Sequence, residues 1–72
     1  MTEQEYLQQL MNAIRQAMQR RNLSFRDAAL ATGIPASTLS GWMHEEARPR
    51  LYQAVKACEA LGIEVPGIGD KA

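Results

Sequence analysis

Few side chains in this sequence of 72 residues could do covalent or metal chemistry. The hydroxyls of Ser37, Thr38 and Ser40 stand close together in the sequence, but a nucleophilic serine needs a histidine base oriented by an acid, and no such set can be recognised. His44 is the single histidine and Cys58 the single cysteine, and no Cys, Asp or Glu stands at zinc-ligand spacing to complete a set with them. We therefore expect no enzyme, no metal site and no cofactor.

The arginines in the middle of the chain could instead bind phosphate. Residues 10–50 contain six basic side chains against three acidic ones, whereas the two ends are acidic and bring the net charge to zero. All six are arginine, whose planar guanidinium suits bidentate phosphate contacts; they are Arg15, Arg20, Arg21, Arg26, Arg48 and Arg50. A solvated, salt-tolerant surface would show the same pattern, so charge alone leaves both interpretations open.

The composition is that of one small globular domain. Apolar residues make up 46% and charged residues 22%, which is too apolar for a disordered chain. No apolar run is long enough to cross a bilayer, and the N-terminal MTEQEYLQQL is acidic and polar where a signal peptide is basic and then apolar. Because Cys58 has no second cysteine to pair with, we expect a reduced, cytoplasmic protein that binds no membrane. A core this small is marginal by itself, which favours a homodimer.

Two helices are predicted at the ends of the chain. Thr2 and Glu5 form a capping-box pattern that opens the first helix, and Asn22 is a suitable stop. The last helix is expected from Leu51 to about Leu61, with Gly62 ending it. Both carry apolar residues at three- and four-residue spacing, which predicts one buried stripe on each helix. In the first helix these residues are Tyr6, Leu7, Leu10, Met11, Ile14, Ala17 and Met18.

Two shorter helices are predicted between them. Ser24 and Asp27 form a second capping pattern, which opens a helix that runs to about Thr32. Gly33 can then turn the chain, because positive φ is cheap for glycine. Pro35 suits the first turn of a helix over 35–44 or 36–44, whose apolar side is Leu39, Trp42 and Met43. The sequence is therefore all-α.

The segment NLSFRDAALATGIPASTLSGWM, residues 22–43, resembles the helix-turn-helix of the lambda repressor/Cro-like family. The resemblance rests on the Leu23-Ser24 entry, Ala29, Gly33-Ile34-Pro35 in the turn, Ser37 to Ser40 opening the second helix, and Trp42. It extends over residues 7–65 and implies a four- to five-helix lambda-repressor-like domain. The expected organisation is a helix-turn-helix domain over residues 1–65 and a flexible or partner-ordered tail over 66–72.

The resemblance also implies where double-stranded DNA binds. The second helix of the motif would lie in the major groove, with Ala36, Ser37, Ser40 and Gly41 facing the bases. The residues that would face the sugar-phosphate backbone are Phe25, Arg26, Pro35, Thr38, Arg48 and Arg50. The expected function is a small transcriptional regulator, a repressor that binds operator DNA as a dimer. Candidate dimer surfaces are residues 63–68, the end of the last helix, and the start of the first helix around Tyr6 and Met11.

An alternative function is a protein-binding module that keeps the helix-turn-helix fold. Family members commonly carry Gln, Arg, Asn or Lys where this sequence has Ala36, Ser37, Ser40 and Gly41, and Glu45-Glu46 would repel phosphates. An antitoxin, an anti-repressor or a phage-encoded inhibitor would fit such a surface. Reversing the charges of Arg48 and Arg50 would separate the two functions, because only DNA binding depends on them.

Overall fold

The first helix, α1 (Glu3–Arg20), is the scaffold on which the other elements pack. The computed structural model of the chain describes residues 2–64 and contains four helices and no strand over that range. The N-terminus of α1 has the predicted capping box: the Glu5 amide donates to Thr2 Oγ1 at 3.1 Å, and the Thr2 amide donates to Glu5 Oε1 at 2.8 Å. These bonds satisfy amides that the first turn of a helix leaves free.

The helix-turn-helix is formed by α2 (Phe25–Thr32) and α3 (Ala36–Met43). The Asp27 amide donates to Ser24 Oγ at 3.0 Å, so the second predicted capping pattern is also present. Gly33 has a φ of 77° and closes α2. In the turn, Thr32 Oγ1 donates to the Ala28 carbonyl and accepts from the Ile34 amide, at 2.8 Å and 3.2 Å. The turn is therefore fixed by a side chain as well as by the glycine.

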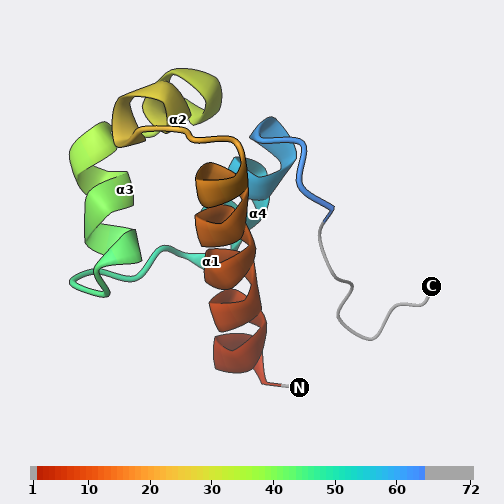
Figure 1. Cartoon of the computed structure of the whole chain (residues 1–72). Coiled ribbons are helices and arrows are strands. Elements are labelled where there is room, and N and C mark those ends of the chain that lie inside the picture. The colour runs from red at the N-terminus through yellow and green to blue at the C-terminus, as the bar shows by residue number, and fades with distance from the viewer. Residues whose placement is uncertain (1, 65–72) are drawn as a thin grey trace.

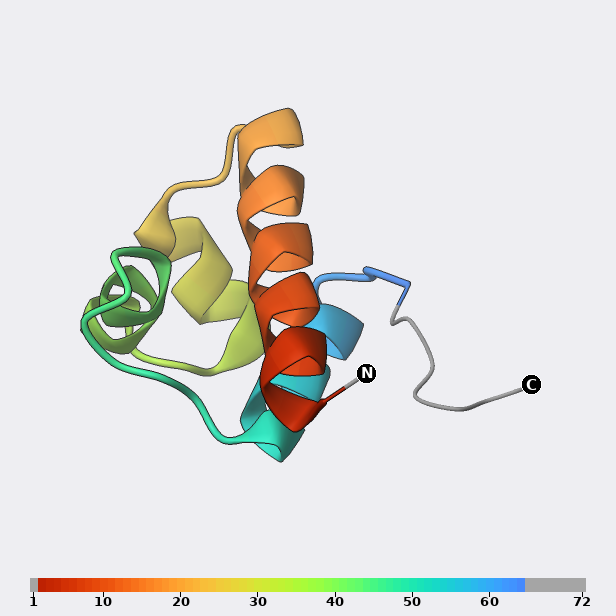
Figure 2. The same cartoon turned by 90° about the horizontal axis from the view of Figure 1, so that it is seen from below.

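The fourth helix, α4 (Leu51–Ala60), packs on the opposite side of α1 from α3. Both views show this arrangement, with α2 and α3 together on one side of α1 (Figures 1 and 2). The Arg50 amide at its start donates to Gln53 Oε1 at 2.9 Å. Within residues 2–64, no helix is long and apolar enough to span a membrane.

One apolar core joins the four helices. The predicted stripe of α1 contributes most of it, and Ala28 is the only fully buried residue of α2, which lets α2 approach its neighbours closely. Cys58 is completely buried, and its thiol lies 3.9 Å from the Leu10 carbonyl oxygen. The buried cluster consists of Tyr6, Leu10, Met11, Ile14, Met18, Ala28, Leu39, Trp42, Ala54, Ala57, Cys58 and Leu61.

The structure corrects some details of the sequence analysis. The start of α1 was a candidate dimer surface, but Tyr6 and Met11 are only 5% and 6% exposed because α1 buries them in the core of the same chain. The last two helices each end one residue earlier than expected, at Met43 and Ala60, and His44 and Leu61 follow as their C-caps. The tail predicted over residues 66–72 lies outside the described residues.

Candidate nucleic-acid interface

The outward face of α3 is polar and built from small side chains. Leu39 and Trp42, 1% and 4% exposed, fix the inner face of the helix against the core. Helical periodicity then turns Ser37 and Gly41 to the opposite side, with Ala36 and Ser40 flanking them. Ser37 and Thr38 are exposed, and Ala36, Ser40 and Gly41 are half-buried. The four residues predicted to face bases thus share one side of α3.

The loop after α3 partly covers Gly41. The amides of Glu46 and Ala47 both donate to the Gly41 carbonyl, at 2.9 Å and 3.3 Å. A Cβ placed on Gly41 would lie 3.8 Å from the Cβ of Ala47, which is an ordinary van der Waals distance. Gly41 is helical and has room for a methyl group, so the fold does not require glycine here.

His44 belongs to this face, although the sequence analysis did not place it there. Its Nδ1 lies 3.2 Å from Ser40 Oγ, and its ring centroid is 6.2 Å from that of Phe25, with the two planes tilted by 55°. The signal in the sequence was its spacing, since residues 37, 40 and 44 are related by three and four positions. No carboxylate completes a catalytic triad with Ser40 and His44 among the hydrogen bonds of residues 2–64.

The N-terminus of α2 lies next to α3, and it leaves two amides free beside the Asp27 carboxylate, which accepts from the Ser24 amide. Ser24 Oγ accepts a hydrogen bond from the Asp27 amide. Within the described residues, the amides of Phe25 and Arg26 therefore make no hydrogen bond. Free amides at the positive end of a helix favour a negatively charged ligand. Arg26 and Pro35 are exposed, whereas Phe25 is half-buried against the core.

Two of the central arginines are engaged within the protein. Arg15 Nη2 donates to the Met43 carbonyl at 2.9 Å, and Arg21 Nη1 donates to the Leu61 carbonyl. Each guanidinium therefore binds the carboxyl end of a helix, where the backbone carries partial negative charge. From the sequence these arginines were expected only as phosphate ligands or solvated surface charges, because partners 28 and 40 residues away leave no local pattern.

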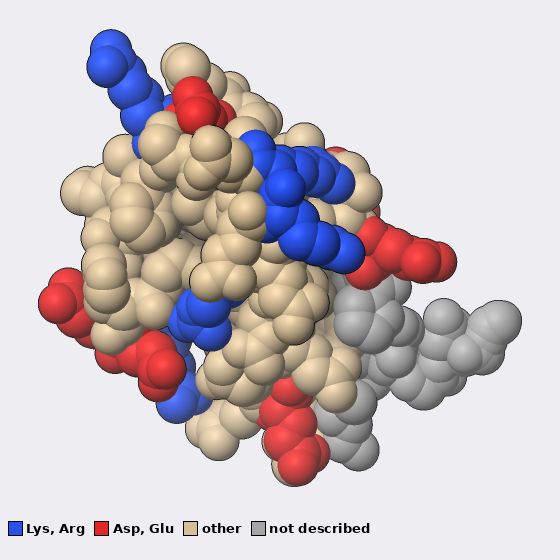
Figure 3. Space-filling model, in the orientation of Figure 1, with Lys and Arg blue, Asp and Glu red and all other residues tan. Residues whose placement is uncertain are grey.

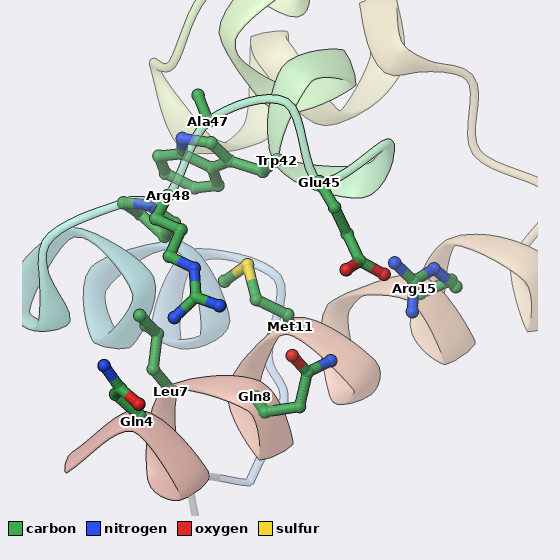
Figure 4. A pocket seen from close by; sticks show the side chains of 10 residues that line it. Gln4, Leu7, Gln8, Met11, Arg15, Trp42, Glu45, Ala47 and Arg48 are labelled. Carbon is green, nitrogen blue, oxygen red and sulfur yellow. The ribbon is translucent and has the colours of Figure 1, made fainter.

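Arg48 and Arg50 are exposed in the loop before α4. Arg48 extends from this loop toward α1 and lines a cavity of about 60 Å³, together with Leu7, Met11 and Trp42 (Figure 4). The Glu45 side chain points toward Arg15 in the same view. Basic and acidic side chains alternate around the face seen in Figure 3, which shows no continuous basic stripe.

No group of three or more His, Cys, Asp and Glu residues in the described part of the chain could hold a metal ion. Burial, and secondarily the negative charge of Glu59, raises the pKa of the Cys58 thiol above its ordinary value. This cysteine therefore stays protonated and is a core residue.

A capped helix, a glycine turn and a second helix with a free polar face together define a helix-turn-helix domain. A family model described as Helix-turn-helix matches residues 14–68, and the chain belongs to this lambda repressor/Cro-like family of DNA-binding regulators. The family and the all-α fold expected from the sequence are thereby confirmed. Searches among curated proteins and solved structures give no match to this chain.

Proposed function

We propose that this protein is a cytoplasmic transcriptional repressor that binds operator DNA as a homodimer and catalyses no reaction. The observation that carries the proposal is the outward face of α3, which the buried Leu39 and Trp42 hold in a fixed direction. An α-helix with its side chains is about 10–12 Å in diameter and fits the major groove of B-DNA. Such a protein would repress by occupying the operator and excluding polymerase.

The contacts divide into two sets. Ala36, Ser37, Ser40 and Gly41 would face base edges: serine can bond any base, and alanine can touch a thymine methyl group. Phosphates would be bound by the open amides at Phe25 and Arg26, by the Thr38 hydroxyl, and by Arg48 and Arg50. Pro35, just before α3, would lie against the sugar-phosphate backbone. Because the base-facing side chains are short, the phosphate contacts would supply most of the affinity.

A dimer would give this small surface enough affinity and specificity. One eight-residue helix reads only a few base pairs, whereas two copies could read half-sites about one helical turn apart. Tyr6 and Met11 on α1 are buried, so the remaining candidate surfaces are the end of α4 and residues 63–68.

The test is fluorescence anisotropy on labelled duplex DNA from upstream of the gene for this protein, at two salt concentrations and with random duplex as competitor. We expect binding that resists the competitor and weakens with salt. Arg48→Glu with Arg50→Glu should weaken binding at least tenfold and flatten the log–log salt slope by about 1.8 per protomer, because two phosphate contacts are lost.

The matched control is Arg20→Glu with Lys56→Glu, which changes the net charge by the same amount. Both control residues are exposed, and Lys56 lies on α4, across α1 from α3. Equal losses in the two double variants would contradict the proposed interface, because they would show that only net charge matters.

A protein partner is the second candidate function. It is favoured by Leu30 on α2, which is 81% exposed, and by the two glutamates that follow α3. If the wild-type protein binds no DNA even at low salt, the repressor proposal fails. The helix-turn-helix would then be a protein-binding module, such as an antitoxin or an anti-repressor, and affinity capture would be the next experiment.

A further inference from the structure

The outward face of α3 carries one imidazole, that of His44, at its carboxyl end. Ser37, Ser40 and His44 lie on this face at three- and four-residue spacing, and the first two are short and neutral. His44 is exposed and stands seven residues after Ser37, about 10 Å further along the helix axis. The major groove is about 12 Å wide. If the first turn of α3 contacts bases, His44 therefore reaches the edge of the groove, beside the phosphates.

Two neighbours hold the His44 ring. Ser40 Oγ lies 3.2 Å from Nδ1, and the Phe25 ring stands against the imidazole at a centroid distance of 6.2 Å. A serine hydroxyl can donate to a neutral Nδ1 and accept from a protonated one. Nε2 then carries a hydrogen in both states, and it has no hydrogen-bond partner within residues 2–64.

Resting on the proposed function, we infer that His44 binds a backbone phosphate through Nε2–H, that Ser40 is its positioning residue, and that DNA binding strengthens as the pH falls. Protonation adds a positive charge at this contact, and a cation that meets a phosphate releases a counterion. The contact therefore has two signatures, a dependence on pH and a steeper salt dependence at low pH.

Two of the charged groups around His44, those of Arg15 and Asp27, are engaged in hydrogen bonds with other residues. On α1, Arg15 donates to the Met43 carbonyl and to Asn12 Oδ1. On α2, Asp27 Oδ2 accepts from the Ser24 amide, and Arg26 is exposed. After α3, the Glu45 side chain points toward Arg15 (Figure 4), and Glu46 is exposed. None of these groups is a histidine, so a change in affinity between about pH 5.5 and pH 8 that requires His44 can be assigned to its imidazole.

The experiment measures the affinity of the full chain for the upstream duplex at about pH 5.5 and pH 8, each at two salt concentrations. We expect the wild-type protein to bind two- to fivefold more tightly per protomer at the lower pH, as for an exposed ion pair. The salt slope should also steepen by about 0.9 per protomer. His44→Gln keeps a hydrogen-bonding side chain without the charge and should abolish both changes; His44→Asn is a second neutral variant, and circular dichroism verifies the helical fold of each.

Ser40 is tested by the ratio of the affinities at the two pH values. A ratio is needed because Ser40 is also expected to face bases, so that its loss would weaken binding at any pH. Ser40→Ala should reduce the gain on acidification, and Ser40→Thr, which keeps the hydroxyl, should restore it. If His44→Gln retains the full gain, the inference is wrong while the proposed function stands. If the wild-type protein binds no DNA at either pH, both are wrong.

Discussion

At the scale of single residues, a substitution of Gly41 on α3 can separate an effect on stability from an effect on DNA binding. We expect Gly41→Ala to raise the free energy of unfolding by about 1 kcal/mol, because alanine is the better helix former and its methyl group would meet Ala47 at an ordinary contact distance. If Gly41 also faces bases closely, the same variant should bind DNA more weakly. Urea denaturation and anisotropy measure the two effects separately. Lower stability of Gly41→Ala would contradict the first expectation and mean that the fold requires glycine at this position.

The buried thiol of Cys58 gives a prediction about pH. Because burial raises its pKa in the folded protein, the neutral thiol is favoured there, and its contribution to stability is complete below the pKa of the unfolded state. This contribution should be lost progressively as the pH rises above about 9, toward the higher folded-state pKa. Urea denaturation between pH 7 and pH 10 measures it, with Cys58→Ala as the control. A stability difference between the two proteins that stays constant over this range would contradict the prediction.

At the scale of elements, the ends of the helices show which signals the sequence carries. Each of the four helices in residues 2–64 is followed by a residue of positive φ: Asn22 at 55°, Gly33 at 77°, Glu45 at 60° and Gly62 at 70°. Asparagine and glycine favour this conformation, so the stops at Asn22 and Gly62 could be predicted. Glutamate does not favour it, and the turn at Glu45 is imposed by the bonds from Glu45 and Glu46 to the carbonyls of Trp42 and Gly41. The path of the loop between α3 and α4 could therefore not be predicted from the sequence.

The strained conformation of Glu45 leads to a stability prediction. Glu45→Gly should raise the free energy of unfolding by about 1 kcal/mol, because glycine adopts positive φ without a steric penalty. Glu46→Gly is the matched control: Glu46 is an adjacent exposed glutamate without positive φ, so glycine should give no gain there. Glu45→Gln tests the charge alone. Equal gains from Glu45→Gln and Glu45→Gly would assign the effect to charge rather than to backbone conformation.

At the scale of the whole molecule, the sequence predicted which residues share a face better than which elements touch. The resemblance to the helix-turn-helix family implied that Ala36, Ser37, Ser40 and Gly41 face one way, and the structure has them on the side of α3 away from the buried Leu39. His44 follows the same spacing, but the sequence analysis considered it only as a metal ligand or a catalytic base. That these residues contact DNA stays a prediction. The bonds of Arg15 and Arg21 depend on how α3 and α4 pack on α1, and no local pattern encodes such packing.

Arg15 connects α1 to the end of α3, and Arg21 connects it to the end of α4. These contacts predict how much each arginine contributes to the free energy of unfolding. Arg15→Met and Arg21→Met keep the apolar stem but remove the guanidinium that binds the end of α3 or of α4. Each should lower the free energy of unfolding by about 1 kcal/mol, because a helix carbonyl loses a charged donor. The two sites share no partner and lie about 9 Å apart along α1, so the losses should add in the double variant.

Arg20→Met is the control for this pair, because Arg20 is an exposed arginine between them and makes no side-chain hydrogen bond in the described part of the chain. It should change the stability by less than about 0.5 kcal/mol. Urea denaturation of all four variants measures the set. A loss at Arg20 equal to that at Arg15 and Arg21 would mean that the charge of α1, and not its bonds to α3 and α4, stabilises the domain. A double variant that loses much less than the sum would mean instead that one bond forms only when the other is present, so that α3 and α4 pack on α1 cooperatively.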